Sequence, residues 1–371
     1  MLFLLCNNLK ECVLPQFTSK LSNMADLISF CPSLRSADLS ASDLSGVKSI
    51  FHFAKDDSNI EKITFPTNQT IPLEGNALNS AFHGCTSLTE LDGLSSMNVT
   101  KITDLDTVFY NCSSLSMLDL SSWNAPKVVT INYTFNGCES LKTIDIGFLA
   151  EAQLTSATGT FKTARKLENI TNFNKLDFSQ CVMLNSMFSE CEKLTNLDTS
   201  NLNASSATNL HDMFFHCYSL SYLNLDKFSL ASATDIGRLF DGCRNLIKIS
   251  GMNTWNLSNV KTMYQMFYYC VSLQEIDMST WHLAPQGTIK ATFYYCSNVR
   301  ELDLSGWDIT NIYSLDGTTN PQLKIFDGCL KLEKATFNNK WYWYDSNKYS
   351  LPTPSQNYIP NADGLWYDLN T

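Results

Sequence analysis

The chain has 371 residues, of which 44% are hydrophobic and 17% are charged, and its formal net charge is -10. This length is enough for two or three ordinary domains or for one elongated array of repeats. The acidic balance and the lack of a run of Lys and Arg argue against a nucleic-acid partner, because phosphate binding requires clustered basic residues. No apolar run approaches the ~20 residues that span a bilayer, so we expect no membrane insertion of this chain.

The two ends of the chain resemble targeting signals only weakly. The first residues, MLFLLCNNLKEC, lack the basic start and the length of a signal peptide. The stretch LPTPS at 351–355 matches a sortase signal only in its first two letters, and no hydrophobic tail follows it. We therefore expect this chain to carry no export signal or anchor.

Degenerate copies of a repeat occupy the first part of the chain. Cys6 and Cys31 begin the series, and Asp57 stands where the next cysteine would be expected. The flanking residues match the later copies poorly, so these first repeats are recognised mainly by their spacing.

The repeat becomes plain further along the chain, as in VFYNCSSLSMLDLSSW (108–123), MFYYCVSLQEIDMSTW (266–281) and TFYYCSNVRELDLSGW (292–307). Its cysteines are spaced by 26 or 27 residues, with Ala164 filling one gap and Cys329 following after a longer step. The regular series consists of Cys85, Cys112, Cys138, Cys191, Cys217, Cys243, Cys270 and Cys296. With the degenerate copies, it indicates about thirteen repeats.

Each repeat contains two hydrophobic periodicities. Apolar residues such as Val260, Met263 and Phe267 precede Cys270 at spacings of three and four, which predicts one buried face of a short helix. The pattern L-x-x-L-x-L follows the cysteine, and its final L-x-L alternates as a short strand with one buried face does. Each repeat is therefore predicted to be a short helix followed by a short strand.

One such repeat cannot bury its own apolar face, whereas stacked neighbours bury a continuous core. We therefore predict an α/β leucine-rich-repeat solenoid over residues 1–337. Strands stack at ~4.8 Å and helices at ~8–10 Å, so the stack should curve into a horseshoe. Short parallel strands would line its concave side, and the short helices would lie on its convex side.

The consensus M-F-x-x-C-x-S-L-x-x-L-D-L-S-x-W resembles the repeat of BspA-like leucine-rich-repeat surface proteins of bacteria, over roughly residues 1–340. Thr134, Thr160 and Thr292 depart from the consensus methionine. The resemblance implies a non-catalytic cell-surface or secreted protein that adheres to a host or microbial surface protein, extracellular-matrix protein or glycan. It implies no catalytic residues.

All thirteen cysteines occupy apolar positions of the repeat, so we expect free, buried thiols that act as small hydrophobic side chains. Helices would hold neighbouring cysteines too far apart for a disulfide, which needs Cα atoms within ~7 Å. No C-x-x-C pair or His cluster occurs, so we expect no metal and no cofactor.

A polar residue lies between the two strand leucines and should point away from the core. The candidate binding residues of this row are Asp92, Asp119, Asp145, Asp198, Asn224, Asp277 and Asp303. The row could bind a basic segment of a partner or Ca²⁺. Alternatively, its carboxylates accept hydrogen bonds from nearby turn N–H groups and serines.

A second candidate surface is aromatic. It comprises Tyr222, Tyr268, Tyr269, Tyr294 and Tyr295. Exposed tyrosines supply a large contact area at low entropic cost, which suits an interaction patch. The alternative is that these rings only stack between adjacent helices of the array.

The array is interrupted and then capped near its end. Turn signals in residues 309–323 predict a projecting loop. Residues 338–371 are predicted to form an aromatic-rich cap, as a β-hairpin, that covers the last core layer with Trp341, Trp343, Tyr358 and Trp366. A glycan-binding module that uses exposed Tyr and Trp, and a purely structural surface-coat component, stay open as alternatives; we expect a monomer.

Overall fold

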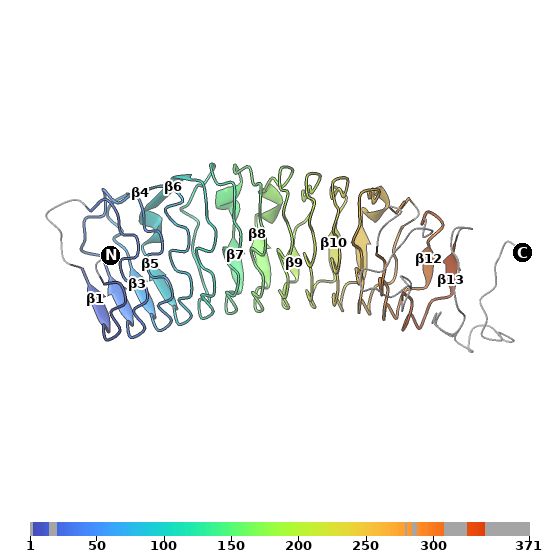
Figure 1. The fold of residues 1–371 in the computed structure, drawn as a ribbon, viewed down its shortest axis with the longest axis horizontal. Helices are drawn as coiled ribbons and strands as arrows, with labels where there is room; N and C mark the ends of the chain where they lie inside the picture. The colour runs from blue at the N-terminus through green and yellow to red at the C-terminus, as the bar shows by residue number, and fades with distance from the viewer. Residues whose placement is uncertain (1–2, 15–20, 279, 284–287, 308–324, 338–371) are drawn as a thin grey trace, which may run out of the picture. The chain divides into compact units, whose positions relative to one another are not determined.

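The computed structural model describes residues 3–14, 21–278, 280–283, 288–307 and 325–337. It divides into an N-terminal unit, Met1–Leu202, and a C-terminal unit, Asn203–Thr371. Each unit is a parallel β-solenoid in which the chain winds through successive turns (Figure 1). The predicted loop at 309–323 and the predicted cap at 338–371 lie outside the described residues, and the predicted extent of a single solenoid over 1–337 stays a prediction.

Short strands form at the L-x-L segments of the N-terminal unit. They are β1 (Glu11–Val13), β2 (Ser36–Asp38), β3 (Lys62–Thr64), β5 (Glu90–Asp92), β7 (Thr143–Asp145), β8 (Asn169–Thr171) and β9 (Asn196–Leu197). They pair in parallel in the orders β1-β2-β3-β5 and β7-β8-β9. A second, separate pair joins β4 (Ile71–Gly75) to β6 (Met97–Ile102). The predicted parallel strands are therefore confirmed.

The C-terminal unit repeats this arrangement. Its strands are β10 (Tyr222–Asn224), β11 (Lys248–Ser250), β12 (Glu301–Asp303) and β13 (Lys334–Thr336), paired as β10-β11 and β12-β13. Pairs such as Leu223 with Ile249 keep the buried residues in register. The equivalent segments around Leu118 and Ile276 form no strand, so the sheets do not confirm the count of about thirteen repeats.

The predicted short helices are wrong, because the described residues contain no α-helix. Four short 3₁₀ segments occur instead: η1 (Leu94–Ser96), η2 (Gly147–Leu149), η3 (Phe173–Lys175) and η4 (Met252–Thr254). The segment before each cysteine of the regular series, Cys85 to Cys296, is a series of turns in which the residues five and one places before the cysteine have positive φ. Ser80 and Gly84 illustrate this before Cys85, with φ of 53° and 76°. Left-handed residues at these two places exclude a continuous right-handed helix.

Hydrogen bonding explains why turns replace the helix. The N–H groups of Ser80, Phe82 and Gly84 donate to carbonyls of the following turn, at 3.1, 3.0 and 2.7 Å. The intervening N–H groups close local turns, as Cys85 N–H does to the Phe82 carbonyl at 3.2 Å. In a helix each of these N–H groups would donate to the carbonyl of residue i-4, so no backbone hydrogen bonds would link adjacent turns of the solenoid. The chain therefore extends its ladder of inter-turn bonds around this side of each turn.

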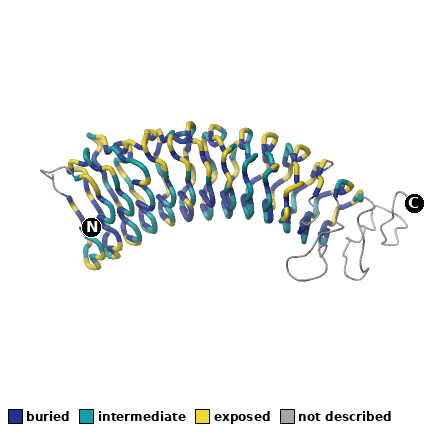
Figure 2. Tube along the Cα trace, turned by 45° about the horizontal axis from the view of Figure 1, so that its top comes forward, coloured by how far each residue is buried: buried dark blue, intermediate teal, exposed yellow. Residues whose placement is uncertain are grey.

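Buried segments recur at the same place in successive turns (Figure 2), and the side chains there form columns of mostly identical residues. In the N-terminal unit, the rings of Phe82, Phe109, Phe135, Phe161 and Phe188 are fully buried, and neighbouring rings stack with centroids 5.4–5.8 Å apart. Aromatic pairs of this kind contribute ~0.5–1.5 kcal/mol beyond area burial. In the C-terminal unit, the Trp255, Trp281 and Trp307 rings form a second stacked column.

The cysteines form another column. All thirteen are free and twelve are buried, so the predicted burial is confirmed except for the half-buried Cys6. Their thiols also donate hydrogen bonds to the backbone of the preceding turn. The Cys112 thiol donates to the Phe82 carbonyl at 3.1 Å, and the Cys270 thiol donates to the Phe240 carbonyl at 3.1 Å. The predicted separation of neighbouring cysteines by helix packing is wrong, because backbone hydrogen bonds like those of parallel strands link the turns, and such strands lie ~4.8 Å apart.

Thiol titration tests this column. Burial raises the pKa of Cys138, Cys181 and Cys329 to about 12, so these thiols stay protonated and unreactive at neutral pH. We expect one thiol, that of Cys6, to react quickly with a thiol reagent in the native protein and all thirteen to react after anaerobic unfolding. Cys6→Ser is the control, since it should abolish the fast phase alone. Several fast-reacting thiols in the native protein would contradict the buried column.

Candidate binding surfaces

The strands present their first and third residues outward and bury the middle one, as the burial of β7 and β10 shows. This places the predicted row of polar residues on one surface of each unit, which we call the strand face. Because the strands pair in register, equivalent side chains of successive turns lie next to one another.

Most members of the polar row accept a hydrogen bond from the backbone N–H two residues further on. The distances are 2.9 Å for Asp119, 2.8 Å for Asp145, 3.1 Å for Asp198, 3.1 Å for Asn224 and 3.0 Å for Asp303. Hydrogen bonds from the Ser121 and Ser200 side chains, together with these backbone bonds, hold the pKa of Asp119 and Asp198 below the usual value. This geometry corresponds to the structural alternative, in which the carboxylates shape the turn.

Two of these carboxylates also connect neighbouring turns. Asn172 Nδ2 donates to both oxygens of Asp145, at 2.7 and 2.9 Å, and Asn174 Nδ2 donates to Asp198 Oδ2 at 2.6 Å. Asp92 instead lies 3.4 Å from Lys62 Nζ. In the N-terminal unit the row is therefore largely engaged in holding its own turns together.

The strand face of the C-terminal unit contains a hollow of about 600 Å³. It is lined by Gln274, Glu275, Ile276, Asp277, Asn298, Arg300, Glu301 and Lys331. Asp277, a predicted site residue, is brought here together with the basic groups of Arg300 and Lys331. The sequence pattern did not indicate these two, because they lie outside the L-x-L columns and come from different turns.

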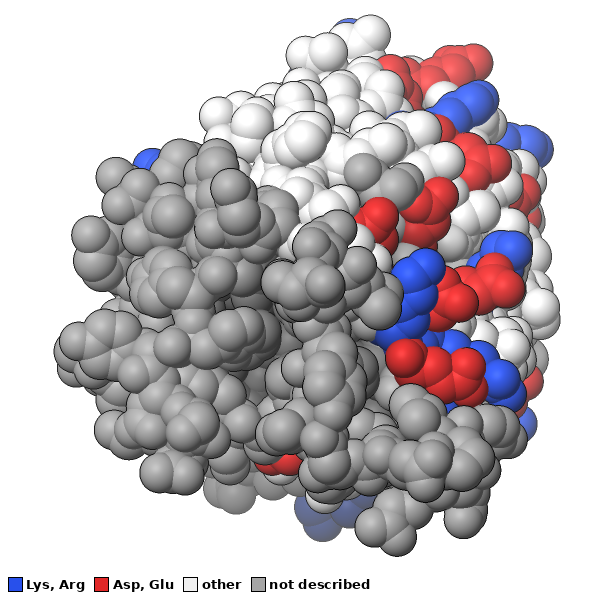
Figure 3. All heavy atoms as spheres, turned by 90° about the vertical axis from the view of Figure 1, so that its right-hand side faces the viewer, with Lys and Arg blue, Asp and Glu red and all other residues white. Residues whose placement is uncertain are grey.

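Charged groups around the hollow pair with the next turn through long, exposed contacts. Lys248 Nζ lies 3.5 Å from Glu275, Arg300 lies 3.3 Å from Glu333, and Lys334 Nζ lies 3.7 Å from Glu301. Figure 3, a view of the right-hand side of Figure 1, shows Lys and Arg side chains intermixed with Asp and Glu side chains on part of the surface. Exposed pairs of this kind contribute only ~0–1 kcal/mol, so a partner can replace them at little cost.

Two exposed apolar side chains lie on the same face as the hollow. Tyr222, the first residue of β10, is 51% exposed, and Ile247, which immediately precedes β11, is 45% exposed. Ile247 lies next to the hollow, because the Gln274 N–H donates to its carbonyl at 3.2 Å. Tyr222 was predicted from the sequence, whereas Ile247 was not, because its position before the strand is polar in most repeats.

The other four predicted tyrosines lie on the turns before Cys270 and Cys296, apart from Tyr222. The Tyr268 ring stacks on the Tyr294 ring at 4.8 Å and 8°, and the Tyr269 ring stacks on the Tyr295 ring at 4.9 Å and 4°. We call these four residues the tyrosine ladder. The ring spacing equals that of adjacent strands, ~4.8 Å, so stacking follows from the inter-turn backbone bonds.

A polar cluster on the same side of the C-terminal unit was not found from the sequence. Arg238 lies 3.9 Å over the Phe215 ring and pairs with Asp212 at 3.4 Å and Asp241 at 3.2 Å. Burial raises the pKa of Asp241 to about 6, although Arg238 opposes this shift. These contacts join two successive turns and stabilise the surface beside the ladder.

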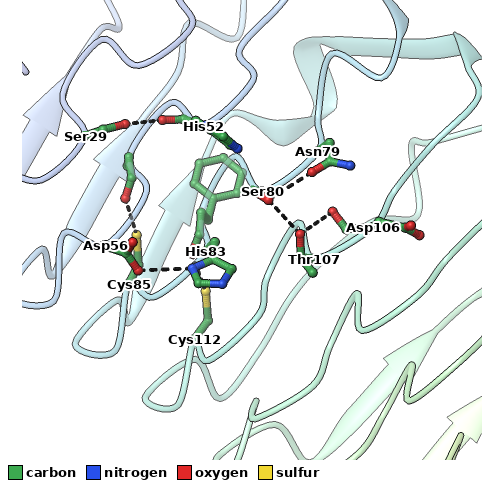
Figure 4. Close-up of polar contacts among 12 residues, drawn as sticks. Ser29, His52, Asp56, Asn79, Ser80, His83, Cys85, Asp106, Thr107 and Cys112 are labelled. Carbon is green, nitrogen blue, oxygen red and sulfur yellow. Dashed lines mark hydrogen bonds and ion pairs between the residues drawn. The ribbon is translucent and has the colours of Figure 1, made fainter.

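A comparable network lies in the N-terminal unit (Figure 4). His83 Nδ1 lies 3.1 Å from Asp56 Oδ1, and the hydroxyls of Ser80 and Thr107 are 2.7 Å apart. Residues at equivalent places of successive turns are thus linked by side chains as well as by the backbone.

Across the described ranges, no group of His, Cys, Asp and Glu could hold a metal ion, and no helix has the length and apolar character needed to span a membrane.

Comparison with known families identifies the repeat. The family model described as "Mycoplasma protein of unknown function, DUF285" matches residues 76–195, 169–250 and 208–327, which together are more than half of the chain. The chain belongs to the DUF285 family. DUF285 is a BspA-like family, so the resemblance inferred from the repeat is confirmed. No curated protein sequence matches the chain.

Solved structures similar to this DUF285 chain are leucine-rich-repeat proteins. One, from Bacteroides ovatus, is 19% identical, with a TM-score of 0.45 and coverage of 89% of this chain and 82% of the other. Another, described as a leucine rich cell surface protein from Faecalibacterium prausnitzii, is 16% identical, with a TM-score of 0.42 and coverage of 89% and 88%. The DUF285 match at 208–327 includes the tyrosine ladder and every residue lining the hollow except Lys331.

Proposed function

We propose that this DUF285 protein is a non-catalytic, cell-surface or secreted binding protein that adheres to a host or microbial macromolecule through the strand face of its C-terminal unit. The observation that carries the proposal is the hollow lined by Arg300, Lys331, Glu275 and Glu301, with the exposed Ile247 next to it and the exposed Tyr222 further along the same face. Apolar anchors beside a polar, mixed-charge rim are the usual composition of a protein-binding surface.

A protein partner is favoured over a glycan. Sugars stack on open aromatic faces, whereas in the tyrosine ladder the faces of Tyr268 and Tyr294 cover each other at 4.8 Å. The ladder therefore presents ring edges and hydroxyls, which can contact polypeptide at the edge of an interface. In the strand-face hollow, charges of both signs match the surface of another protein better than a neutral sugar.

The proposal of a non-catalytic role agrees with the chemistry of the cysteine column. A nucleophilic cysteine needs an accessible thiolate, which a depressed pKa supplies. In this chain Cys138 and Cys329 are buried, and burial raises their pKa to about 12. Binding, and not turnover, is the activity that these surfaces support.

A binding screen with matched variants tests the proposal. Wild-type protein is assayed on arrays of purified extracellular-matrix proteins, microbial surface proteins and glycans, together with Arg300→Glu and with Tyr222→Ala/Ile247→Ala. We expect a protein ligand for the wild type and at least a tenfold loss of affinity in both variants, since loss of a central anchor costs ~2 kcal/mol or more.

Arg35→Glu is the matched control. Arg35 precedes β2 as Arg300 precedes β12, and each pairs with a glutamate of the next turn, Glu61 or Glu333. Its substitution changes the net charge equally but leaves the hollow intact, so binding should be retained. Equal losses in Arg35→Glu and Arg300→Glu would indicate a nonspecific charge effect, and ligands confined to the glycan array would favour the alternative function.

A further inference from the structure

The tyrosine ladder contains two pairs of rings that are held face to face. The turn before it and the turn after it have no tyrosine at the equivalent positions. In the row one place before the cysteine, Gly242 precedes Tyr269 and Gly328 follows Tyr295. A Cβ added to Gly328 would lie 2.7 Å from the Tyr295 ring, so only glycine fits there. In the neighbouring row Asp241 precedes Tyr268 and Asp327 follows Tyr294. Each tyrosine therefore has one stacked tyrosine partner, on the adjacent turn.

The backbone fixes the pairing. Tyr269 and Tyr295 have φ of 56° and 57°, so their side chains leave the chain in the same direction. The Tyr269 N–H donates to the Tyr294 carbonyl at 2.8 Å, which joins the two turns at the ladder itself. The rings are nevertheless accessible: the first three are half-buried and Tyr295 is 39% exposed. A reagent in solution can reach them while the fold holds them together.

We propose that the tyrosine ladder is a site of oxidative cross-linking, at which a heme-peroxidase-type oxidant with hydrogen peroxide joins Tyr268 to Tyr294 or Tyr269 to Tyr295 through a carbon–carbon bond. Each phenol loses one electron and one proton to give a phenoxyl radical. The two radicals couple at ring carbons next to the hydroxyl-bearing carbon, and each ring then moves its displaced hydrogen to oxygen, which restores both hydroxyls. In sum, two ring C–H bonds are replaced by one C–C bond, and hydrogen peroxide is reduced to two waters.

Stacked placement is what distinguishes these tyrosines from others in the chain. Radical coupling needs two rings in contact, and both pairs are already at 4.8–4.9 Å. Tyr222 is more exposed but lies on β10, apart from the ladder, and Tyr110 stacks on His83 at 4.6 Å. Tyr133 is 37% exposed, and its ring packs against Gly159 of the next turn. The link would tie two turns of the C-terminal unit covalently.

The chain offers a direct test. Trypsin cleaves after Lys261, Lys290 and Arg300, so Tyr268 and Tyr269 fall in peptide 262–290 and Tyr294 and Tyr295 fall in peptide 291–300. Full-length protein at low concentration is treated with a heme peroxidase and hydrogen peroxide, digested, and analysed by mass spectrometry and by dityrosine fluorescence. We expect a species that contains both peptides and lacks two hydrogens relative to their sum.

Conservative variants provide the controls, because phenylalanine keeps the stacked ring and removes the reacting hydroxyl. Tyr295→Phe should retain part of the cross-link through Tyr268 and Tyr294, whereas Tyr294→Phe/Tyr295→Phe should abolish it. Peptides carrying Tyr133 or Tyr222 should stay uncrosslinked in every sample. Failure to join peptides 262–290 and 291–300, joining only between separate copies of the chain, or equal yield in the double variant would overturn the proposal.

Discussion

Replacing Asp57 with asparagine is expected to raise the free energy of unfolding at pH 8 by several kcal/mol. The substitution should also remove most of the dependence of that free energy on pH. Asp57 is fully buried at a position that holds cysteine in most repeats. Its Oδ1 accepts the Cys31 N–H, and its Oδ2 is buried with no hydrogen-bond partner. Burial raises the pKa of Asp57 from 3.8 to about 8. Asparagine keeps the acceptor and carries no charge.

The sign of the pH dependence follows from the raised pKa. Between pH 4 and 8 the folded state holds a proton on Asp57 that the unfolded state has released, so stability falls as pH rises. The contribution is fully present below pH 3.8 and is lost as pH passes through about 8. Each pKa unit corresponds to ~1.4 kcal/mol, which sets the expected size.

Urea unfolding at pH 5, 6.5 and 8 measures this effect in the wild type and in Asp57→Asn. Asp57→Cys, which restores the residue of the column, should behave like Asp57→Asn. Asp56→Asn is the matched control, because Asp56 is the adjacent carboxylate, half-buried and paired with His83 at 3.1 Å, and its replacement should change little. Wild-type stability that is constant from pH 5 to 8 would contradict the prediction.

Replacing Gly93 with alanine is expected to destabilise the N-terminal unit far more than replacing Gly75. Both glycines have positive φ, 82° and 64°, so both substitutions incur the left-handed penalty of ~1–2 kcal/mol. A Cβ at Gly93 would lie 2.3 Å from the Phe65 carbonyl oxygen, whereas a Cβ at Gly75 would meet nothing within 4 Å. The difference between the variants therefore isolates the clash between neighbouring backbones, which we expect to cost ~2 kcal/mol or more.

Chemical or thermal unfolding of the two single variants, side by side, measures that difference. Gly75→Ala should shift the midpoint modestly, and Gly93→Ala should shift it several times further or prevent folding at 37 °C. Equal shifts of the midpoint in the two variants would mean that the turns containing Phe65 and Gly93 can move apart without cost. That result would contradict the close backbone contact between these turns.

The strands and the core columns were predictable because they depend on local patterns. Alternation in segments such as Leu302–Asp303–Leu304 allows one strand register with a buried face, and the structure has it. The helices were mispredicted because spacings of three and four also bury one side of a chain of turns. The sequence does carry a signal for the turns: Gly84, Gly137 and Gly242 stand one place before the cysteine, where positive φ is required.

The candidate sites were predictable only in part. The motif of an acidic residue two places before Ser or Gly, as in Asp119 and Ser121, is local, so the structural role of the polar row could be weighed from the sequence alone. The hollow could not be found in that way. It assembles Glu275, Arg300 and Lys331 from three successive turns, and their approach depends on the register between those turns.

Carboxylate footprinting in the presence of a protein ligand from the binding screen tests the central claim most directly. Glu275 and Glu301 have side chains that are 78% and 69% exposed, so carbodiimide should label both in the free protein. Glu61 and Glu90, on the strand-face side of the N-terminal unit, are matched controls at 53% and 59%. The ligand should protect Glu275 and Glu301 and leave Glu61 and Glu90 labelled. Unchanged labelling of Glu275 and Glu301 at saturating ligand would contradict binding through the strand face of the C-terminal unit.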